Sequence, residues 1–393
     1  MLEGALASGL ASEGVDVAFL GIVPTPEIAW RSAADGSPGA VISASHNPYA
    51  DNGIKFFVSG GRKLEDAIEE RLESELDRIL TGNAAPAVTG HITTVAPDDR
   101  YAEALVGMID GRTLAGVHVV VDCAQGAGFR VAPDVLRRLG ARVDVLSADP
   151  DGTNINDGCG STHPQQLQKV VVEQRADVGL ALDGDADRVL AVDHRGELVD
   201  GDQIIALCAV DLRERGRLKD DTVAVTVMTN LGFRQAMGAC GIHVVETAVG
   251  DRYVLEALEE GGWSLGGEQS GHVIFRDLAT TGDGLLTGLQ VLDVMARTGR
   301  SLADLASVMT RLPQVLRNVR VAHRDGLEGA EPFWAEVRSA EADLGGAGRV
   351  LVRSSGTEPL VRVMVEAPTP EAAEGTAERL CAALAAALGT PTP

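Results

Sequence analysis

Three aspartates stand at alternate positions between two apolar runs. The stretch LALDGDADRVLAV, residues 180–192, contains Asp183, Asp185 and Asp187. Alternate residues of an extended segment face the same side, so this spacing predicts carboxylates that converge on one point. Such charges repel unless a cation lies among them, and hard oxygen ligands suit Mg²⁺, Mn²⁺ or Ca²⁺. A hairpin turn with surface acids is the alternative. Arg188, the next charged residue, indicates a phosphate nearby and joins the catalytic candidates.

A second stretch places a serine, a histidine and a lysine in one polar loop. Residues 41–57, VISASHNPYADNGIKFF, run from an apolar strand through this loop into another apolar strand. Loops at strand ends often hold reactive groups, and a serine beside a histidine can act as a nucleophile. Asn-Pro and Asp-Asn-Gly are ordinary turn formers, so a plain turn is the alternative. A turn alone does not account for the grouping of Ser45, His46 and Lys55, which we interpret as catalytic candidates.

Two further loops carry groups suited to a phosphorylated polyhydroxy ligand. In RSSGTEPLVR, residues 353–362, hydroxyls and backbone N–H groups lie between two arginines that can clamp a phosphate. In GGEQSGHVIF, residues 266–275, hydrogen-bonding side chains follow paired glycines. A plain turn and a structural loop are the respective alternatives. The binding candidates are Arg353, Ser354, Ser355, Gly356, Thr357 and Arg362 in one loop and Glu268, Ser270 and His272 in the other.

The elements that must position these loops alternate between strands and helices. Apolar runs predict strands at residues 15–23, 117–122, 142–146, 177–182, 223–228, 243–247 and 264–275. Amphipathic stretches predict helices at residues 2–13, 64–80, 131–139, 166–175, 203–215, 251–260 and 284–297. This alternation is typical of an α/β protein with mostly parallel sheets. The last block instead predicts a strand, a helix, strands at 348–353 and 360–366, and a final helix, as in a small α+β layer.

Turn-rich stretches divide the chain into four predicted domains. A chain of 393 residues is too long for one ordinary core. Residues 81–99, 195–202 and 312–316 are rich in turn formers or contain a proline that closes a helical block. We therefore expect three mixed α/β domains of similar topology, followed by an α+β domain, around a central cleft. Their predicted ranges are 1–98, 99–197, 198–316 and 317–393, and each range contains one of the four loops.

The overall composition excludes several classes of protein. The chain has 57 acidic and 34 basic residues, a net charge of −23, which nucleic acid and anionic membrane surfaces repel. No apolar run reaches the roughly 18 residues of a membrane span, and the start lacks the basic segment of a signal peptide. The 5 cysteines form no C-x-x-C pair and predict neither a disulfide framework nor a zinc site. We expect a cytoplasmic protein without nucleic-acid or membrane partners.

Together the four loops resemble those of the α-D-phosphohexomutase superfamily. SASHNP, DGDADR, GEQSGH and RSSGTEP occur in the family's order and at a similar spacing. Gln269 is similar to the residue found in the branch that acts on glucosamine phosphate. The resemblance implies four domains around one cleft, each of which contributes one of these loops.

The resemblance also implies an activity and its participants. The chain would be an isomerase that interconverts glucosamine 6-phosphate and glucosamine 1-phosphate, through hexosamine 1,6-bisphosphate, for UDP-N-acetylglucosamine synthesis. Ser45 would carry the phosphoryl group and, with Asp183, Asp185 and Asp187, hold one Mg²⁺ per chain. Glu268 and Ser270 would face sugar hydroxyls, and residues 353–362 would hold the non-reacting phosphate. Lys55 and His46 are alternatives for the general acid/base, and the chain would be a monomer or a homodimer.

Two alternatives to this activity stay open. A phosphomannomutase or phosphoglucomutase would use the same chemistry on another sugar. The family also has an N-terminal segment with an active-site arginine and the first strands of domain 1, and the sequence resembles a chain that starts after it. We therefore expect the first strands of domain 1 to be missing, with lower stability and activity than an extended form, or a catalytically impaired remnant that binds phosphosugar. The helix predicted at residues 2–13, with no strand before it, favours this expectation.

Overall fold

The computed structural model describes residues 1–64, 66–80, 89–322, 326–354 and 360–389. The chain separates into two compact units. The larger comprises Met1–Met228 and Ile242–Val308, and the smaller comprises Thr229–Gly241 and Met309–Pro393. In the described ranges, no helix combines the length and apolar character that a membrane crossing requires.

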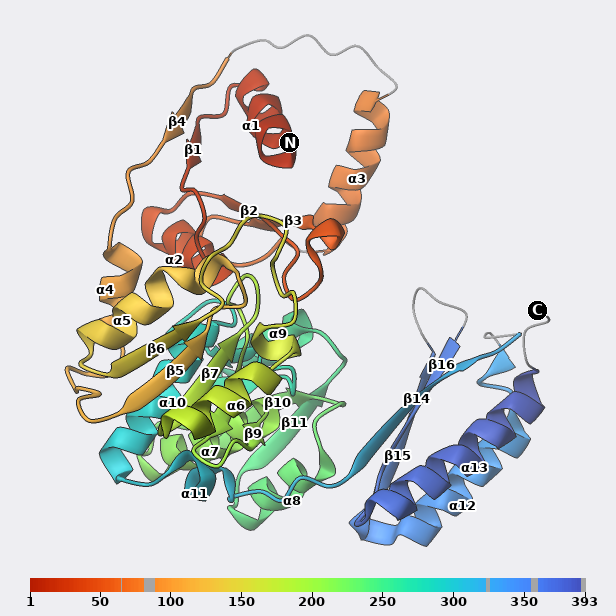
Figure 1. The fold of residues 1–393 in the computed structure, drawn as a ribbon. Helices are drawn as coiled ribbons and strands as arrows, with labels where there is room; N and C mark the ends of the chain where they lie inside the picture. Colours follow the sequence, from red (N-terminus) through yellow and green to blue (C-terminus); the bar gives the residue numbers. More distant parts are fainter. Residues whose placement is uncertain (65, 81–88, 323–325, 355–359, 390–393) are drawn as a thin grey trace. The chain divides into compact units, whose positions relative to one another are not determined.

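The N-terminal segment of the larger unit forms two small sheets (Figure 1). β1 pairs with β4 in parallel, and β2 pairs with β3 in antiparallel register. Phe57 at the end of β3 is buried against Ile28 and Val41, which joins this hairpin to α2. The elements are α1 (Leu2–Ser12), β1 (Val17–Phe19), α2 (Thr25–Asp35), β2 (Gly39–Ser43), β3 (Gly53–Phe57), α3 (Asp66–Leu80) and β4 (Ile92–Thr94).

The next segment forms a five-stranded sheet with the strand order β6-β5-β7-β8-β9. β6, β5 and β7 are parallel, whereas β8 and β9 run antiparallel to their neighbours. The β-branched run of β5 is buried at every position, as expected for a central strand covered on both faces. The elements are α4 (Arg100–Gly107), β5 (His118–Asp122), α5 (Val131–Arg138), β6 (Arg142–Leu146), α6 (Gln165–Gln174), β7 (Val178–Leu182), β8 (Val189–Asp193) and β9 (Leu198–Val199).

The third segment repeats this arrangement in a four-stranded sheet, β11-β10-β12-β13. Again the first strand in the sequence, β10, pairs in parallel with both β11 and β12. The last strand, β13, pairs with β12 in antiparallel register. Asp200 and Gln203 form a reciprocal capping box at the start of α7. The elements are α7 (Gly201–Glu214), β10 (Thr222–Thr226), β11 (His243–Thr247), α9 (Asp251–Gly261), β12 (Leu265–Gly267), β13 (Val273–Phe275), α10 (Gly284–Thr298) and α11 (Leu302–Ala306).

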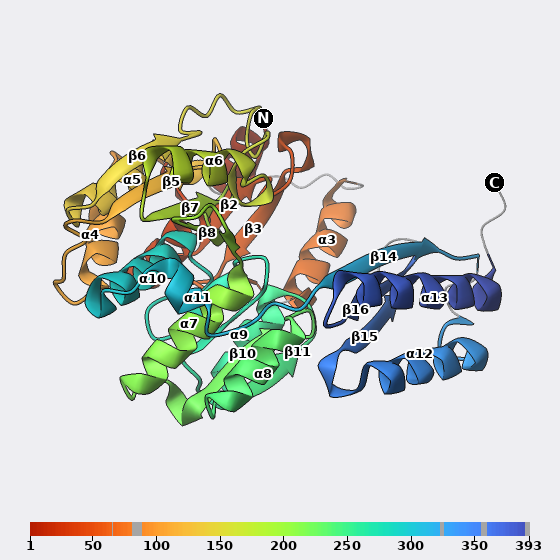
Figure 2. The same cartoon turned by 60° about the horizontal axis from the view of Figure 1, so that its bottom comes forward.

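The smaller unit is an antiparallel sheet, β14-β16-β15, with α12 and α13 on one face (Figure 2). Phe333 of α12, Val363 of β16 and Leu380 of α13 are fully buried in its core. Helix α8 belongs to this unit, since the Leu231 N–H donates to Glu366 Oε2 at 2.9 Å. The elements are α8 (Leu231–Ala239), β14 (Gln314–Arg320), α12 (Glu331–Leu344), β15 (Arg349–Ser354), β16 (Leu360–Glu366) and α13 (Pro370–Leu388).

The predicted α/β alternation and the α+β character of the last block are confirmed. Two expectations were wrong in detail. Residues 264–275 form two antiparallel strands, β12 and β13, because the turn at 268–271 reverses the chain. The sheets are mixed rather than mostly parallel, since each parallel set in the second and third segments ends in an antiparallel strand. The domain boundaries at residues 98, 197 and 316 stay predictions. Short 3-10 turns occur at Tyr49–Asp51, Ala127–Phe129, Gly160–Thr162, Lys219–Asp221 and Gly345–Ala347.

Candidate active site

Three of the four predicted loops are turns between antiparallel strands of the larger unit. The serine loop joins β2 to β3, the aspartate loop joins β7 to β8, and residues 268–272 join β12 to β13. The aspartates do not lie in an extended segment as predicted. Ala186 has a left-handed backbone with φ 58°, and its N–H donates to Asp183 O at 3.0 Å. The three carboxylates therefore converge through a tight turn of the backbone and not through the alternation of an extended strand.

The aspartate turn provides a cluster that fits a divalent cation. One carboxylate oxygen from each of Asp183, Asp185 and Asp187 lies within 4.8 Å of the others, and all three residues are buried. The Oδ1 atoms of Asp185 and Asp187 are buried without a hydrogen-bond partner. Burial, together with the negative charges of its two neighbours, raises the pKa of Asp183 well above its ordinary value. Three buried carboxylates this close together, two of them with an oxygen that accepts no hydrogen bond, are an arrangement that a hard cation stabilises.

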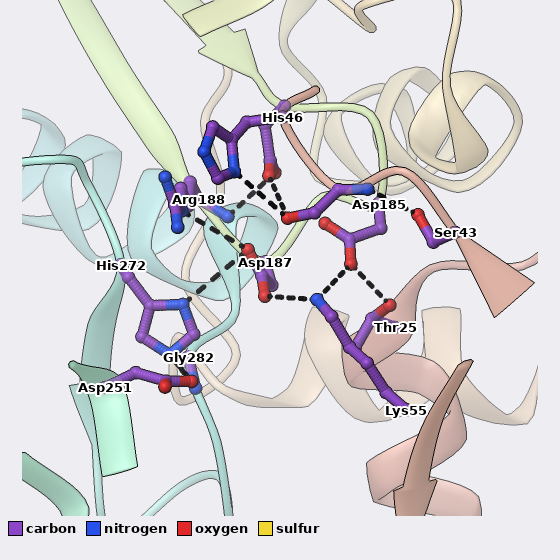
Figure 3. A network of polar contacts seen from close by, with 12 residues as sticks. Thr25, Ser43, His46, Lys55, Asp185, Asp187, Arg188, Asp251, His272 and Gly282 are labelled. Atoms are coloured by element: carbon purple, nitrogen blue, oxygen red, sulfur yellow. Dashed lines mark hydrogen bonds and ion pairs between the residues drawn. The ribbon is translucent and has the colours of Figure 1, made fainter. Parts of the chain in front are cut away.

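Groups from distant segments hold the aspartate turn in place (Figure 3). Thr25, the first residue of α2, donates its hydroxyl to Asp185 Oδ2 at 2.8 Å and its N–H to Asp185 O at 3.0 Å. Lys55 Nζ lies 2.7 Å from Asp185 Oδ2 and 3.4 Å from Asp187 Oδ2. Burial lowers the pKa of Lys55, but the carboxylates of Asp187 and Asp185 outweigh it and hold that pKa above its ordinary value. Arg188 donates its backbone N–H to Asp183 Oδ1 at 3.0 Å.

Ser45 lies directly beside this cluster. Its Oγ is 3.4 Å from Asp183 Oδ2 and 3.4 Å from His46 Nδ1. Burial and the positive charge of Arg188 lower the pKa of His46, which favours the neutral ring near pH 7. The structure thus brings together all the predicted catalytic and metal-binding candidates. A hydroxyl, an imidazole, an ammonium group and a cation-binding cluster can together serve phosphoryl transfer.

His272 connects the aspartate cluster to a second set of side chains. It is buried at the start of β13, with Nδ1 3.6 Å from Asp187 Oδ1 and Nε2 3.4 Å from Asp251 Oδ2. The Gly282 N–H donates to the same Nε2 at 3.2 Å, which places the ring proton on Nδ1, toward Asp187, in the neutral tautomer. Asp251 also pairs with Lys63. Burial raises the pKa of Asp251, but the positive charge that His272 carries when it is protonated, together with Lys63, outweighs burial and lowers that pKa to about 2.

The predicted sugar-binding turn is only partly free. Glu268 Oε1 accepts the Gly250 N–H at 3.1 Å, which links the turn to the start of α9. Ser270 is exposed at the tip. Gln269 contacts the α7 cap, with Nε2 3.4 Å from Asp200 Oδ2. Of these side chains, Ser270 is available to a ligand, while the other two also hold the local structure.

The predicted phosphate-binding residues belong to the smaller unit. Arg353 and Arg362 stand directly opposite each other on β15 and β16. Burial and the positive charge of Arg362 lower the pKa of Arg353. No acidic side chain in the described part of the chain forms an ion pair with either arginine. Ser354 is exposed at the end of β15, and Ser355, Gly356 and Thr357 lie outside the described residues.

Three contacts of this site were not predicted, namely those of Thr25, Lys63 and Asp251. Thr25 and Asp251 are the first residues of helices, a place that sequence patterns fill with acceptors and hydroxyls for structural reasons. Lys63 had a usable signal. The chain has only 4 lysines, and two of them, Lys55 and Lys63, lie within the site.

Comparison with known proteins gives a consistent result along the chain. Family models for phosphoglucomutase/phosphomannomutase match four consecutive segments. Alpha/beta/alpha domain I matches residues 1–82, domain II residues 99–196, domain III residues 200–312 and the C-terminal domain residues 316–383.

Curated relatives extend this match over nearly the whole chain. The chain is 56% identical to the phosphoglucosamine mutase of Frankia alni, over 99% of this chain and 86% of the relative. It is 53% identical to the phosphoglucosamine mutase of Streptomyces avermitilis, over 99% of this chain and 87% of the relative.

Solved structures share the fold. A phosphoglucomutase/phosphomannomutase family protein from Burkholderia thailandensis has a TM-score of 0.80 at 27% identity, covering 100% of this chain and 88% of its own. An N-acetylphosphoglucosamine mutase from Aspergillus fumigatus, solved with GlcNAc-6P and magnesium, has a TM-score of 0.71 at 21% identity, covering 92% of this chain and 91% of its own.

Proposed function

We propose, on the premise that the chain belongs to the phosphoglucomutase/phosphomannomutase family, that it interconverts glucosamine 6-phosphate and glucosamine 1-phosphate. The observation that carries the proposal is the position of Ser45. Its Oγ lies 3.4 Å from Asp183 Oδ2, beside a cluster that fits a cation. The choice of sugar rests on relatives at 53–56% identity that are named phosphoglucosamine mutases.

A magnesium ion fits the aspartate cluster by its chemistry. Asp185 and Asp187 each keep a buried Oδ1 without a hydrogen-bond partner, and Mg²⁺ prefers carboxylate oxygens. Asp183, Asp185 and Asp187 would hold the ion, together with the phosphorylated side chain of Ser45. Such an ion neutralises negative charge on a transferring phosphoryl group.

The reaction then consists of two phosphoryl transfers at Ser45. In the first, the bond between phosphorus and Ser45 Oγ breaks, and a bond forms to the free hydroxyl of the sugar phosphate, which gives a 1,6-bisphosphate. In the second, after the intermediate has turned over, Ser45 Oγ takes the other phosphoryl group. The sugar hydroxyl that accepts the phosphoryl group loses a proton in the first step, and the other sugar oxygen gains one when its phosphoryl group leaves in the second, so one side chain can hold the proton in between.

Lys55 and His46 both stay candidates for that proton carrier. His46 Nδ1 is within 3.4 Å of Ser45 Oγ, where the transferred group leaves. Lys55 extends from β3 to the aspartate cluster, where its ammonium group is 2.7 Å from Asp185 Oδ2. We expect His46→Asn and Lys55→Met to differ in the pH profile of kcat, because only the variant that lacks the carrier loses the corresponding ionisation.

The phosphate that does not react would bind between Arg353 and Arg362. Two guanidinium groups side by side repel each other, and a phosphate between them relieves this repulsion through two charge-assisted contacts. The same pair can hold the phosphate at either end of the sugar, which a reaction with interchangeable ends requires.

A comparison of three substrates tests the proposal. The purified chain is supplied with Mg²⁺ and a trace of bisphosphate, and turnover of glucosamine 6-phosphate, mannose 6-phosphate and glucose 6-phosphate is measured side by side. Intact mass shows whether Ser45 carries a phosphoryl group. Preference for glucosamine 6-phosphate by at least about tenfold in kcat/KM supports the proposal. Preference for another sugar overturns the choice of substrate, and binding without turnover overturns the activity itself.

A further inference from the structure

We propose that Asn156 is a positioning residue that holds Ser45 in its reactive conformation. This inference rests on the proposed function, in which Ser45 carries the phosphoryl group. Asn156 lies in the loop between β6 and α6, more than a hundred residues from the serine. Its Nδ2 donates one hydrogen bond to Ser45 O at 2.8 Å and another to Asn47 O at 2.8 Å. One buried amide thus ties both ends of the serine turn to the sheet that carries the aspartates.

Ser45 needs such support because its backbone is unfavourable. Its φ of 52° is in the left-handed region, which L-residues other than glycine adopt at a cost of roughly 1 kcal/mol. The local sequence offers two aids, since Ser43 Oγ accepts the Ser45 N–H at 2.9 Å and Ala44 O accepts the Asn47 N–H at 2.9 Å. Those bonds fix the start of the turn, whereas the carbonyl groups of Ser45 and Asn47 depend on Asn156.

The amide of Asn156 can be oriented in only one way. Both atoms near its Nδ2 are carbonyl oxygens, which accept hydrogen bonds, so the nitrogen must face them. The residue is 6% exposed, and its Oδ1 is buried without a hydrogen-bond partner. A buried unpaired acceptor costs roughly 1–3 kcal/mol. The left-handed backbone of Asn156, with φ 59°, favours asparagine locally, but only the two bonds to the serine turn account for the direction of its buried amide.

Asn156 is itself held firmly. Its N–H donates to Ala124 O at 2.9 Å, so its backbone is joined to the end of β5. The buried carboxylate of Asp122 accepts the N–H groups of Ala124 and Gly160, both at 2.9 Å, and so closes the loop around Asn156. On the other side of the serine turn, a Cβ at Gly184 would lie 2.5 Å from Ser45 O. The serine turn therefore lies between Asn156 and the backbone of the aspartate turn.

The experiment compares Asn156→Ala with a matched change in the same loop. Asn154 also uses its side chain for two hydrogen bonds, but these go to Asp151 N and Asp149 O within the loop. We expect Asn156→Ala to lower kcat by about 10- to 100-fold with KM within about twofold, because a small displacement of a reacting group is costly while the substrate contacts remain. Asn154→Ala should leave kcat unchanged. Thermal melting of all variants confirms that they fold.

A second variant and a second readout keep the proposal testable without turnover. Asn156→Asp has nearly the same shape but places an oxygen against two carbonyl oxygens, so it should lower kcat at least as far as alanine does. Limited proteolysis within residues 43–53 should be faster in Asn156→Ala than in Asn154→Ala, whether or not the chain turns over substrate.

Four results would overturn the inference. Wild-type kcat in Asn156→Ala, or equal losses in Asn154→Ala, would show that the amide does not position Ser45. A rise in KM as large as the fall in kcat would show that Asn156 acts on the substrate. Equal cleavage of the serine turn in both alanine variants would show that Asn156 does not hold it. Absence of turnover in the unchanged chain would instead contradict the proposed function, and the cleavage test would still decide the role of Asn156.

Discussion

The aspartate turn and the arginine pair of the smaller unit show two ways in which a fold holds like charges together. Asp183, Asp185 and Asp187 are buried in a tight turn, and the Oδ1 atoms of the last two have no hydrogen-bond partner. Arg353 and Arg362 stand opposite each other across two strands and are only half-buried. Both arrangements are unfavourable alone and indicate a ligand of opposite charge. Under the proposed function, this difference in burial suits a resident ion at the first site and an exchanging phosphate at the second.

Removal of the proposed phosphoryl carrier has the largest expected effect. Ser45→Ala should lower turnover by more than about a thousandfold, since no other group takes its place as the phosphoryl carrier. The fold should persist, because among the described contacts the Ser45 hydroxyl meets only Asp183 and His46, both at 3.4 Å. Turnover and melting temperature are measured together. An alanine variant with turnover within tenfold of the unchanged chain would rule out the covalent route.

Loss of one aspartate should be the next most damaging change. Asp187→Asn removes a charged ligand and should weaken Mg²⁺ binding by at least about tenfold and turnover by about a hundredfold. Titration calorimetry measures the first effect, and chelation followed by added Mg²⁺ confirms that the metal is the cause. Asp193→Asn is the control, since Asp193 is equally buried on β8 but pairs with Arg195. Similar losses of metal affinity in both variants would contradict a specific metal role for Asp187.

A change at the arginine pair should act on binding rather than on the chemical step. Arg362→Ala should raise KM by about 10- to 100-fold and lower kcat by less than about threefold, because the grip on the non-reacting phosphate is similar in ground and transition states. Arg317→Ala is the control on the same sheet, where the guanidinium pairs with Glu374. A large fall in kcat with KM unchanged would place Arg362 at the reacting phosphate instead.

The smallest effect on activity is expected at a buried acid outside the aspartate turn. Asp283 caps α10 and accepts a hydrogen bond from the Tyr101 hydroxyl at 2.6 Å. Burial, only partly opposed by these donors, raises the pKa of Asp283 to about 6. Because the folded state binds this proton more tightly than the unfolded state, the associated stability is present below about pH 4 and is lost as pH rises through about 6.

Asp283→Asn tests the direction of this pH dependence of stability. Asparagine caps helices as well as aspartate but does not ionise, so the variant should lack the loss of stability between about pH 4 and 6. The melting temperature of the unchanged chain should fall relative to the variant over that range, by about 2–6 °C. Turnover at pH 7 should stay within about twofold. A difference in melting temperature that is independent of pH would show that Asp283 does not titrate in this range.

Much of the fold followed from the sequence because its signals are local. The buried run VVV of β5 acts within a few residues. The loop within residues 266–275 was predicted, but the hairpin that it closes was not, because each of its strands has only 3 residues. The two strands become distinct only when they pair in antiparallel register, with Gly267 opposite Val273.

The site was predictable as a set of loops but not as a network. The types of Ser45, Asp183 and Lys55 indicated a nucleophile beside a cation site, and the resemblance of the four loops to a known family implied phosphoryl transfer. The residues that contact them could not be predicted in this way. Thr25 and Asp185 are 160 positions apart in the sequence, and Asn156 and Ser45 are 111 positions apart. Such contacts depend on how the segments pack, and no spacing rule in the sequence encodes them.

The close approach at Gly184 has a consequence for how this chain can be recombined with its relatives. The serine turn and the aspartate turn touch there through backbone atoms, and a Cβ would lie 2.5 Å from both Ser45 O and the Ile155 side chain. Chimeric genes with a crossover between residues 45 and 184 would join turns from two parents at this contact. Such a hybrid needs parents whose main chains match to within a fraction of an ångström. The turn that carries Ser270 imposes the same demand toward β8, since a Cβ at Gly271 would lie 2.3 Å from Val189 O.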